Sequence, residues 1–335
     1  MSSKSKSDNR PLISILIPVF NEEKNVSLAH KALVEQFDKL KDEYRYELLF
    51  SDNHSSDNTE SELVRIAAVD KNVKVIRLAR NFGFQRSIMT AYRHASGDAA
   101  IQFDCDLQDP PELIATFLEK WKAGHDVVVG IRRKREENRF LNFGRRLFYK
   151  LVTAISDDNI MENAGDFRLV DRSVLDQLAL ISDARPYTRG IVSSLAANQT
   201  GVEYDRRARK FDQSKFPLRK LTSFATDGIV SHSLAPLRLA SFCGMIIFAG
   251  SILVALYYFL AFLIAGQAWP AGFATLVILL LMSLGLNAIF IGIVGEYVGR
   301  IYDQVRVRPL TVIERTINME DAPPLSNQKE RQTEA

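Results

Sequence analysis

The sequence predicts an α/β domain with a mostly parallel sheet, followed by a two-helix transmembrane hairpin. Strand-like and helix-like segments alternate as far as residue 131, and several of the predicted strands end in carboxylates. A later stretch, from Leu239 to Gly295, contains no charged residue. These three observations separate a domain with a polar surface from an apolar segment that suits a bilayer.

The alternation of short apolar runs and helical patterns supports the α/β prediction. Runs rich in Val, Ile and Leu predict strands at residues 12–20, 46–52, 73–79, 99–104 and 126–131. Apolar residues at helical spacing predict the intervening helices at residues 25–40, 58–68, 84–95 and 111–124. Because this order of elements joins parallel strands through helices, we expect a ligand site beyond the carboxyl ends of the strands.

The uncharged stretch supports the hairpin prediction. One bilayer crossing needs about 20 helical residues, so the stretch accommodates two crossings, at 240–265 and 272–296. The flanks carry Arg238, Arg300, Arg306 and Arg308, whereas the connection GQAWPAG carries no Lys or Arg. The positive-inside rule therefore predicts a multi-pass protein with the α/β domain and both termini on the cytoplasmic side of the membrane.

The predicted organisation has five parts. They are a disordered tail (1–10), a catalytic domain (11–215), a juxtamembrane interfacial segment (216–237), two transmembrane helices (238–299) and a cytoplasmic C-terminal tail (300–335). The N-terminal MSSKSKSDNRP has no apolar core and does not read as a signal peptide. The net charge of +3 does not indicate nucleic-acid binding, and Cys105 and Cys243 lack metal-ligand spacing.

The segment FDCDLQDPPE places Asp104 and Asp106 one residue apart at the end of a predicted strand. Carboxylates this close need a cation or hydrogen-bond donors to offset their repulsion. The chain lacks the glycine-rich motifs of a dinucleotide site at its first strand-to-helix turn and of a P-loop, and the EF-hand spacing fails. The pattern that remains is an Asp-x-Asp pair holding Mg²⁺ or Mn²⁺ against a diphosphate.

Several segments together resemble glycosyltransferase family 2, which has a GT-A nucleotide-sugar-binding fold. They are ILIPVFNEEKN, SDNHSSDNT, RNFGFQRSIMTAYRHASGDAAIQFDCDLQDPPE and GDFRLVDR. The later RRARKFDQSKFPLRKL, DGIVSHSLAPLR and the paired apolar spans resemble the polyisoprenyl-phosphate glycosyltransferases, which include bactoprenol glucosyltransferases, undecaprenyl-phosphate aminoarabinose transferases and dolichol-phosphate mannose synthases. The resemblance covers residues 11–310. Where the family usually has DDGSSD this chain has SDNHSSD, so Asn53 and His54 replace an Asp-Gly pair.

The resemblance implies an inverting, metal-dependent transfer of a sugar from a nucleotide-diphospho-sugar, with UDP-glucose as the first candidate, to undecaprenyl phosphate. It implies Mg²⁺ or Mn²⁺ as cofactor, the bilayer as a partner, no nucleic acid, and allows a homo-oligomer. The implied nucleotide-sugar contacts are Pro18, Phe20, Glu22, Asp52 and Asp104. The implied metal ligands are Asp106 and Gln108, and the implied catalytic residues are Asp104, Asp106 and Asp166. The implied phosphate and acceptor contacts are Arg132, Arg206, Arg207, Arg209 and Lys215.

Several of these residues also have a simpler, structural interpretation. Asp57 and Glu60 have the spacing of a capping box, and Asp166 could pair with Arg168 or Arg172. Residues 132–139 could be a solvated loop, and the basic residues from 206 to 220 could attract anionic lipid headgroups. His54 and Cys105 suit packing or polar contacts better than catalysis.

Three other functions compete with the predicted one. A processive polysaccharide synthase is disfavoured, because neither Trp121 nor Trp269 lies in a Gln-x-x-Arg-Trp motif. A glycosyltransferase acting on another membrane lipid, with a hydroxyl acceptor, would need Asp166 as a base. A catalytically silent membrane scaffold is the third alternative, and the set of Asp52, Asp104, Asp106 and Asp166 argues against it.

Overall fold

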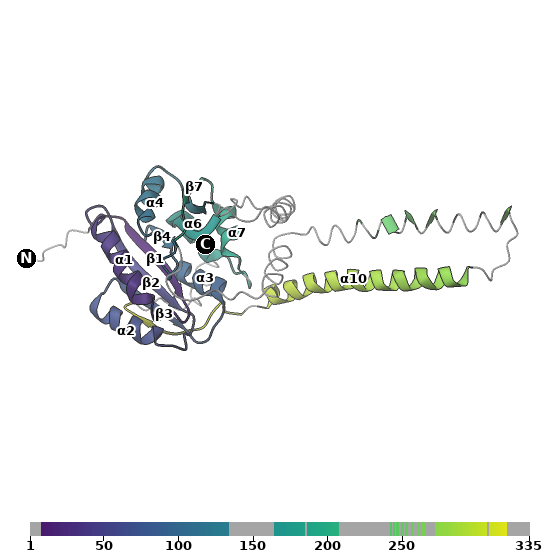
Figure 1. The fold of residues 1–335 in the computed structure, drawn as a ribbon, viewed down its shortest axis with the longest axis horizontal. Helices are drawn as coiled ribbons and strands as arrows, with labels where there is room; N and C mark the ends of the chain where they lie inside the picture. The colour runs from purple at the N-terminus through teal and green to yellow at the C-terminus, as the bar shows by residue number, and fades with distance from the viewer. Residues whose placement is uncertain are drawn as a thin grey trace, which may run out of the picture. The chain divides into compact units, whose positions relative to one another are not determined.

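The computed structural model describes residues 8–133, 164–207 apart from 185, 272–306, 308–319 and scattered helical positions between 242 and 264. The chain divides into two compact units. The first draws on residues 1–143, 158–215 and 308–335, and the second on residues 144–157 and 216–307. Figure 1 shows the elements of both units by label and colour.

The first unit is built on an eight-stranded sheet with the order β7-β5-β6-β4-β1-β2-β3-β8. Figure 1 labels strands β1 to β4 and β7 of this sheet. The strands are β1 (Leu12–Val19), β2 (Arg45–Asp52), β3 (Val73–Leu78), β4 (Ala99–Gln102), β5 (Val127–Arg132), β6 (Ala164–Asp171), β7 (Gln199–Tyr204) and β8 (Ile313–Ile317). Strand β6 pairs antiparallel with β4 and β5, and β8 pairs antiparallel with β3, whereas every other neighbouring pair is parallel. The prediction of an α/β domain with a mostly parallel sheet is confirmed.

Helices cover both faces of this sheet. They are α1 (Val26–Asp38), α2 (Thr59–Val69), α3 (Phe84–His94), α4 (Leu113–Lys122), α6 (Arg172–Leu180) and α7 (Thr188–Leu195). Side chains alternate along a strand, so Ile15 and Ile17 of β1 pack into one core with α1, α2 and α4. Leu16 faces the other way, into a second core with α3, α6 and α7. Every strand and helix predicted up to residue 131 is present, with ends within two residues of those expected.

Strand β8 was not predicted, because its five exposed or half-buried residues form no apolar run. It follows the apolar part of the chain and pairs with β3 at the edge of the sheet. Asn318, directly after β8, donates from Nδ2 to the backbone oxygens of Ala67 (2.7 Å) and Val73 (2.9 Å). The segment predicted as a C-terminal tail therefore contributes a strand to the sheet of the first unit.

The second unit contains the long helix α10 (Phe273–Val305). Within it, residues Met282–Val305 are long and apolar enough to cross a membrane, with a mean hydropathy of 1.4 and no buried positions. This span overlaps the second predicted crossing, 272–296. Most of the first predicted crossing, 240–265, and all of the interfacial segment 216–237 lie outside the described residues. The part of the chain that is described thus has one candidate membrane span, by length and composition.

Candidate functional site

Three loops at the carboxyl ends of adjacent strands form the candidate site. They follow β2, β1 and β4, which are neighbours in the sheet. Each loop holds one residue other than glycine in the left-handed region: Asn21 (φ 58°), His54 (φ 63°) and Leu107 (φ 55°). Such conformations cost on the order of 1 kcal/mol each and cluster at functional sites. The candidate site lies at the rim of the sheet where the sequence analysis placed it.

Hydrogen bonds join the loop after β1 to the loop after β2. They run from Asn21 N to Ser55 Oγ (2.9 Å), from Glu22 N to Thr59 Oγ1 (2.8 Å) and from Ser56 N to Asn21 Oδ1 (2.8 Å). Phe20 is 45% exposed beside these contacts, whereas Pro18 is half-buried at the end of β1. An exposed ring on a loop fixed in this way offers a surface on which a planar base can stack.

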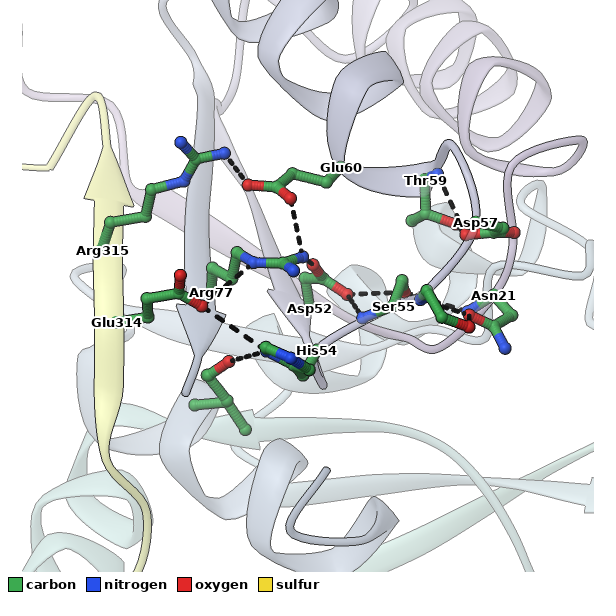
Figure 2. Close-up of polar contacts among 12 residues, drawn as sticks. Asn21, Asp52, His54, Ser55, Asp57, Thr59, Glu60, Arg77, Glu314 and Arg315 are labelled. Carbon is green, nitrogen blue, oxygen red and sulfur yellow. Dashed lines mark hydrogen bonds and ion pairs between the residues drawn. The ribbon is translucent and has the colours of Figure 1, made fainter. Parts of the chain in front are cut away.

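Asp57 connects the same two loops instead of forming a capping box. Its carboxylate accepts from Thr59 N (3.0 Å), Thr59 Oγ1 (2.6 Å) and Glu23 N (3.3 Å). Burial alone would raise the pKa of Asp57, but these hydrogen bonds hold it below its ordinary value. The predicted capping box is wrong, because α2 begins at Thr59 and Glu60 pairs with Arg77 at 3.1 Å (Figure 2).

Asp52 ends β2 and is fully buried. One carboxylate oxygen accepts from Ser55 N (2.9 Å) and Ser55 Oγ (2.6 Å), and the other accepts from Arg77 Nη1 at 2.5 Å (Figure 2). Both oxygens are therefore occupied by groups of the protein. The structure gives Asp52 a clear part in shaping the loop after β2, and its predicted contact with a nucleotide stays a prediction.

Three carboxylates crowd the turn after β4, which we call the acidic turn (residues 104–109). The side chain of Asp104 is 23% exposed, Asp106 is almost buried and Asp109 is fully buried. Burial raises the pKa of Asp104 to about 7, and the carboxylates of Asp166, Asp109 and Asp106 add to this, against the opposing charge of Arg206. A cation at this turn would relieve the strain between these charges.

Asp109 is held from the neighbouring strands β5 and β7. Its Oδ1 accepts from the hydroxyl of Tyr204 (2.5 Å), and Arg206 Nε lies 3.4 Å away. Its Oδ2 is buried without a hydrogen-bond partner among the described residues, 3.8 Å from Arg132 Nη2. Gly130 makes this arrangement possible, because a Cβ there would come within 2.8 Å of the Tyr204 ring. The sequence analysis assigned no role to Asp109 or Tyr204, although Asp109 is the third acidic residue of FDCDLQD.

The oxygen atoms of the acidic turn suit a hard divalent ion whose remaining coordination positions are filled by a substrate. Asp104, Asp106 and Gln108 supply oxygen ligands of the kind that Mg²⁺ and Mn²⁺ take. Among the described residues, no group of three or more His, Cys, Asp or Glu side chains is arranged to hold a metal. Mg²⁺ commonly binds through one or two carboxylates, with substrate phosphates completing its coordination. The residues present suit that incomplete kind of site.

Asp166 on β6 forms a bidentate ion pair with Arg189 on α7. Arg189 Nε and Nη2 lie 2.7 Å and 2.6 Å from the two carboxylate oxygens. Burial alone would raise the pKa of Asp166, but Arg189, with further help from Arg168 and Arg132, holds it below its ordinary value. Asp166 is therefore ionised, with both oxygens engaged.

The ion pair of Asp166 is with Arg189 and not with Arg168 or Arg172, the two arginines named in the alternative interpretation. Arg168 Nη2 donates to the backbone oxygen of Gly165 (2.9 Å), and Arg172 Nε donates to that of Gly97 (2.9 Å). No role was predicted for Arg189, because it lies on a later helix, α7, in a segment that carries no recognisable motif.

The predicted phosphate-binding residues are placed unequally. Arg132 and Arg206 lie beside Asp109, and Arg206 Nη2 is also 3.9 Å from Asp104 Oδ2. The backbone N–H of Arg207 donates to Gln108 O (2.9 Å), while its guanidinium pairs with Glu112 (3.1 Å). The other two predicted residues, Arg209 and Lys215, lie outside the described residues. The structure thus brings the guanidinium groups of two predicted arginines, Arg132 and Arg206, and the backbone of a third, Arg207, to the acidic turn.

Cys105 and His54, expected to make packing or polar contacts, do so. Cys105 is buried, and burial raises the pKa of its thiol, so it is a poor nucleophile. His54 Nδ1 lies 3.1 Å from the backbone oxygen of Leu78 and 3.5 Å from Glu314 Oε2 (Figure 2). His54 therefore connects the loop after β2 to the end of β3 and to β8.

Comparison with known proteins gives consistent matches over most of the chain. The family model described as "Glycosyl transferase family 2" matches residues 14–179. An "Uncharacterized glycosyltransferase YkcC" from Bacillus subtilis is 37% identical over 92% of this chain and 95% of its own. A "Bactoprenol glucosyl transferase" from Shigella phage SfV is 37% identical over 90% of this chain and 97% of its own.

A solved structure is also similar, at a more remote level. It is a mannosyltransferase from Pyrobaculum calidifontis, PcManGT, in complex with GDP-Man and Mn²⁺, and it is 17% identical. The match covers 89% of each chain with a TM-score of 0.43, which is too low for this likeness to carry an argument about the present chain.

Proposed function

The chain belongs to glycosyl transferase family 2, and from that premise we propose that it transfers a sugar from a nucleotide-diphospho-sugar to a polyprenyl phosphate at the cytoplasmic face of the inner membrane. Glucose from UDP-glucose is the first candidate for the sugar, and undecaprenyl phosphate for the acceptor. The observation that carries the proposal is the 37% identity, over nearly whole chains, to an enzyme named for glucosyl transfer to bactoprenol.

Residues at the rim of the sheet support this proposal. The loops after β1 and β2 offer the exposed ring of Phe20 and a fixed backbone for the nucleoside, in keeping with a GT-A-like domain. Arg132 and Arg206, beside the acidic turn, are placed to offset phosphate charge. The predicted contacts of Arg209 and Lys215 with phosphate remain part of the proposal.

The acceptor determines what Asp166 must do. A phosphate monoester is already ionised near neutral pH, because its second pKa is about 6. It can attack the anomeric carbon without a strong base, as the bond from that carbon to the diphosphate breaks and the configuration inverts. Asp166, ionised and held by both oxygens, suits orienting Arg189 and the reacting groups better than removing a proton.

Asp106 and Gln108, with Asp104 beside them, would hold the Mg²⁺ or Mn²⁺ ion. The ion, when bound, supplies positive charge that stabilises the departing diphosphate. The fold keeps these carboxylates close enough to raise the pKa of Asp104 and largely buried, so that a cation is favoured there.

The apolar helix α10 gives a reason for a lipid acceptor. Its candidate span Met282–Val305 would anchor the enzyme in the bilayer, and a second crossing at 240–265 would complete a hairpin with both termini in the cytoplasm. An anchored enzyme meets a lipid phosphate at the headgroup plane instead of by diffusion from solution.

A panel of donors tests the proposal. Purified full-length protein in vesicles with undecaprenyl phosphate and Mg²⁺ is offered radiolabelled UDP-glucose, UDP-N-acetylglucosamine and GDP-mannose in separate reactions. We expect label in the lipid phase from one donor, with loss of label when undecaprenyl phosphate is omitted. Label that depends on added diacylglycerol instead would indicate another lipid acceptor, and no label from any donor would favour a silent scaffold.

A further inference from the structure

Strand β8 brings two consecutive charged residues to the end of β3. In the pairing, Arg77 lies opposite Arg315 and Leu78 lies opposite Ile313, so Glu314 is the extra residue of a β-bulge. Consecutive side chains of a regular strand point to opposite faces, but a bulge redirects one of them. Glu314 and Arg315 both reach the same group of charges as a result (Figure 2).

That group, which we call the Arg77 cluster, consists of Asp52, His54, Glu60, Arg77, Glu314 and Arg315. The guanidinium of Arg77, largely buried, lies 2.5 Å from Asp52, 3.1 Å from Glu60 and 3.2 Å from Glu314. Glu60 contacts Arg77 through one carboxylate oxygen and Arg315 through the other. Glu314 therefore fixes one end of the guanidinium whose other end holds Asp52 (Figure 2).

Glu314 also contacts the loop after β2 directly. The two groups beside His54 Nδ1 are the Leu78 carbonyl and the Glu314 carboxylate, and both are acceptors, so Nδ1 carries a proton. His54 is held between them with φ 63°, a conformation that glycine adopts freely and other residues adopt at a cost. The contacts of His54 offset that cost.

We propose that Glu314 is a positioning residue for the nucleotide end of the donor site. It acts through Arg77 on Asp52 and through His54 on the loop after β2, which is bonded to the loop that carries Phe20. The segment that follows the apolar helix α10 thus completes the donor site. This inference rests on the proposed function, because it assumes that a nucleotide binds these loops.

The test separates donor binding from chemistry. We expect Glu314→Gln to raise KM for the donor that labels lipid in the panel about 5-fold, with kcat and KM for undecaprenyl phosphate within about twofold of wild type. His54→Gly should relax the backbone and keep the thermal midpoint, yet raise KM for the donor in the same direction. Binding of the matching nucleoside diphosphate, measured by calorimetry on the full-length protein, should weaken by the same factor.

A double-variant cycle tests the route through Arg77. The double variant Arg77→Lys with Glu314→Gln should have a KM for the donor no more than about twofold above that of the single variant with the higher KM. Both substitutions disturb the same series of contacts, from Glu314 through Arg77 to Asp52. The matched control is Thr316→Ala, an exposed position on the same strand, which should behave as wild type and combine additively with Arg77→Lys.

Two results would overturn the inference in different ways. A wild-type KM and nucleotide affinity in Glu314→Gln, in an enzyme that is active in the panel, would remove the positioning role and leave the proposed function intact. An inactive wild-type protein that binds none of the nucleoside diphosphates would overturn both.

Discussion

The Arg77 cluster and the acidic turn lie at the carboxyl ends of the same sheet, yet they balance their charges differently. In the Arg77 cluster each carboxylate has a cationic partner from the protein, at 3.2 Å or closer. In the acidic turn the nearest guanidinium to Asp104 is 3.9 Å away, and the pKa of that carboxyl is raised to about 7. The charges of the Arg77 cluster are thus paired within the protein, whereas we propose that the acidic turn is completed by a bound ion.

This difference suits the Arg77 cluster and the acidic turn to separate functions. A region whose charges are already paired is rigid and suits recognition of a substrate by shape. A region with surplus negative charge favours a cation and the phosphates that accompany it. Substitutions in the acidic turn should therefore lower sugar transfer, whereas substitutions in the Arg77 cluster should lower stability.

The largest effect is expected at the acidic turn. Asp106→Asn keeps the shape of the side chain but removes one charge from the proposed ion site. We expect sugar transfer to fall about 100-fold or more, with the thermal midpoint unchanged. Assays in chelator, followed by addition of Mg²⁺ or Mn²⁺, provide the control; an Asn variant that is fully active in chelator would contradict the assignment.

A smaller and different effect is expected in the Arg77 cluster. Asp52→Asn takes one carboxylate from a nearly buried guanidinium that keeps Glu60 and Glu314. We expect a loss of about 2 kcal/mol of stability, and a thermal midpoint lower by about 4–8 °C, measured on detergent-solubilised protein. If stability were unchanged while transfer stopped, Asp52 would belong with the acidic turn, and the contrast between the regions would fail.

Arg189 tests the side of the acidic turn that faces away from the Arg77 cluster, because its partner Asp166 is on β6, the neighbour of β4 opposite to β1. Arg189→Lys keeps the charge beside Asp166 but cannot form two parallel hydrogen bonds. We expect kcat to fall about 10-fold, without a change in KM for the donor. A larger fall that is restored at high pH would instead indicate that Asp166 acts as a base.

The smallest effect is expected outside both regions, at Asp171. Its carboxylate caps α6 through Ser173 N (2.8 Å) and accepts from Trp121 Nε1 (2.7 Å). Asp171→Ala should cost about 1 kcal/mol of stability and leave transfer unchanged. If Asp171→Ala lost transfer activity as well as stability, the losses of activity in the other variants could be explained by lower stability alone.

The pH dependence of this control follows from the pKa of Asp171. Burial alone would raise that pKa, but the hydrogen bonds from Ser173 and Trp121 hold it below its ordinary value. Stability from the ionised carboxylate is therefore present above the unfolded pKa, near 3.9, and is lost as the pH falls through the folded value. The wild type and Asp171→Ala should converge in stability below about pH 4.

The sequence predicted what local patterns determine. Continuous apolar runs identified β1 to β5, and carboxylates at strand ends identified the rim. Strand β8 and Arg189 were not predictable in this way. Strand β8 is stabilised by pairing with β3, which lies far from it in the sequence. Arg189 owes its role to an ion pair with Asp166, which belongs to a different element of the fold. Long-range pairing leaves little trace in local periodicity.

We propose that the acidic turn is half of an ion site and that the donor diphosphate completes it. Titration of full-length protein with Mn²⁺, followed by electron paramagnetic resonance with and without uridine diphosphate, tests it most directly. We expect Mn²⁺ to bind at least about 10-fold more tightly with the nucleotide present, and this coupling to vanish in Asp106→Asn. Equal Mn²⁺ affinity with and without the nucleotide, in a protein that binds both, would contradict the account.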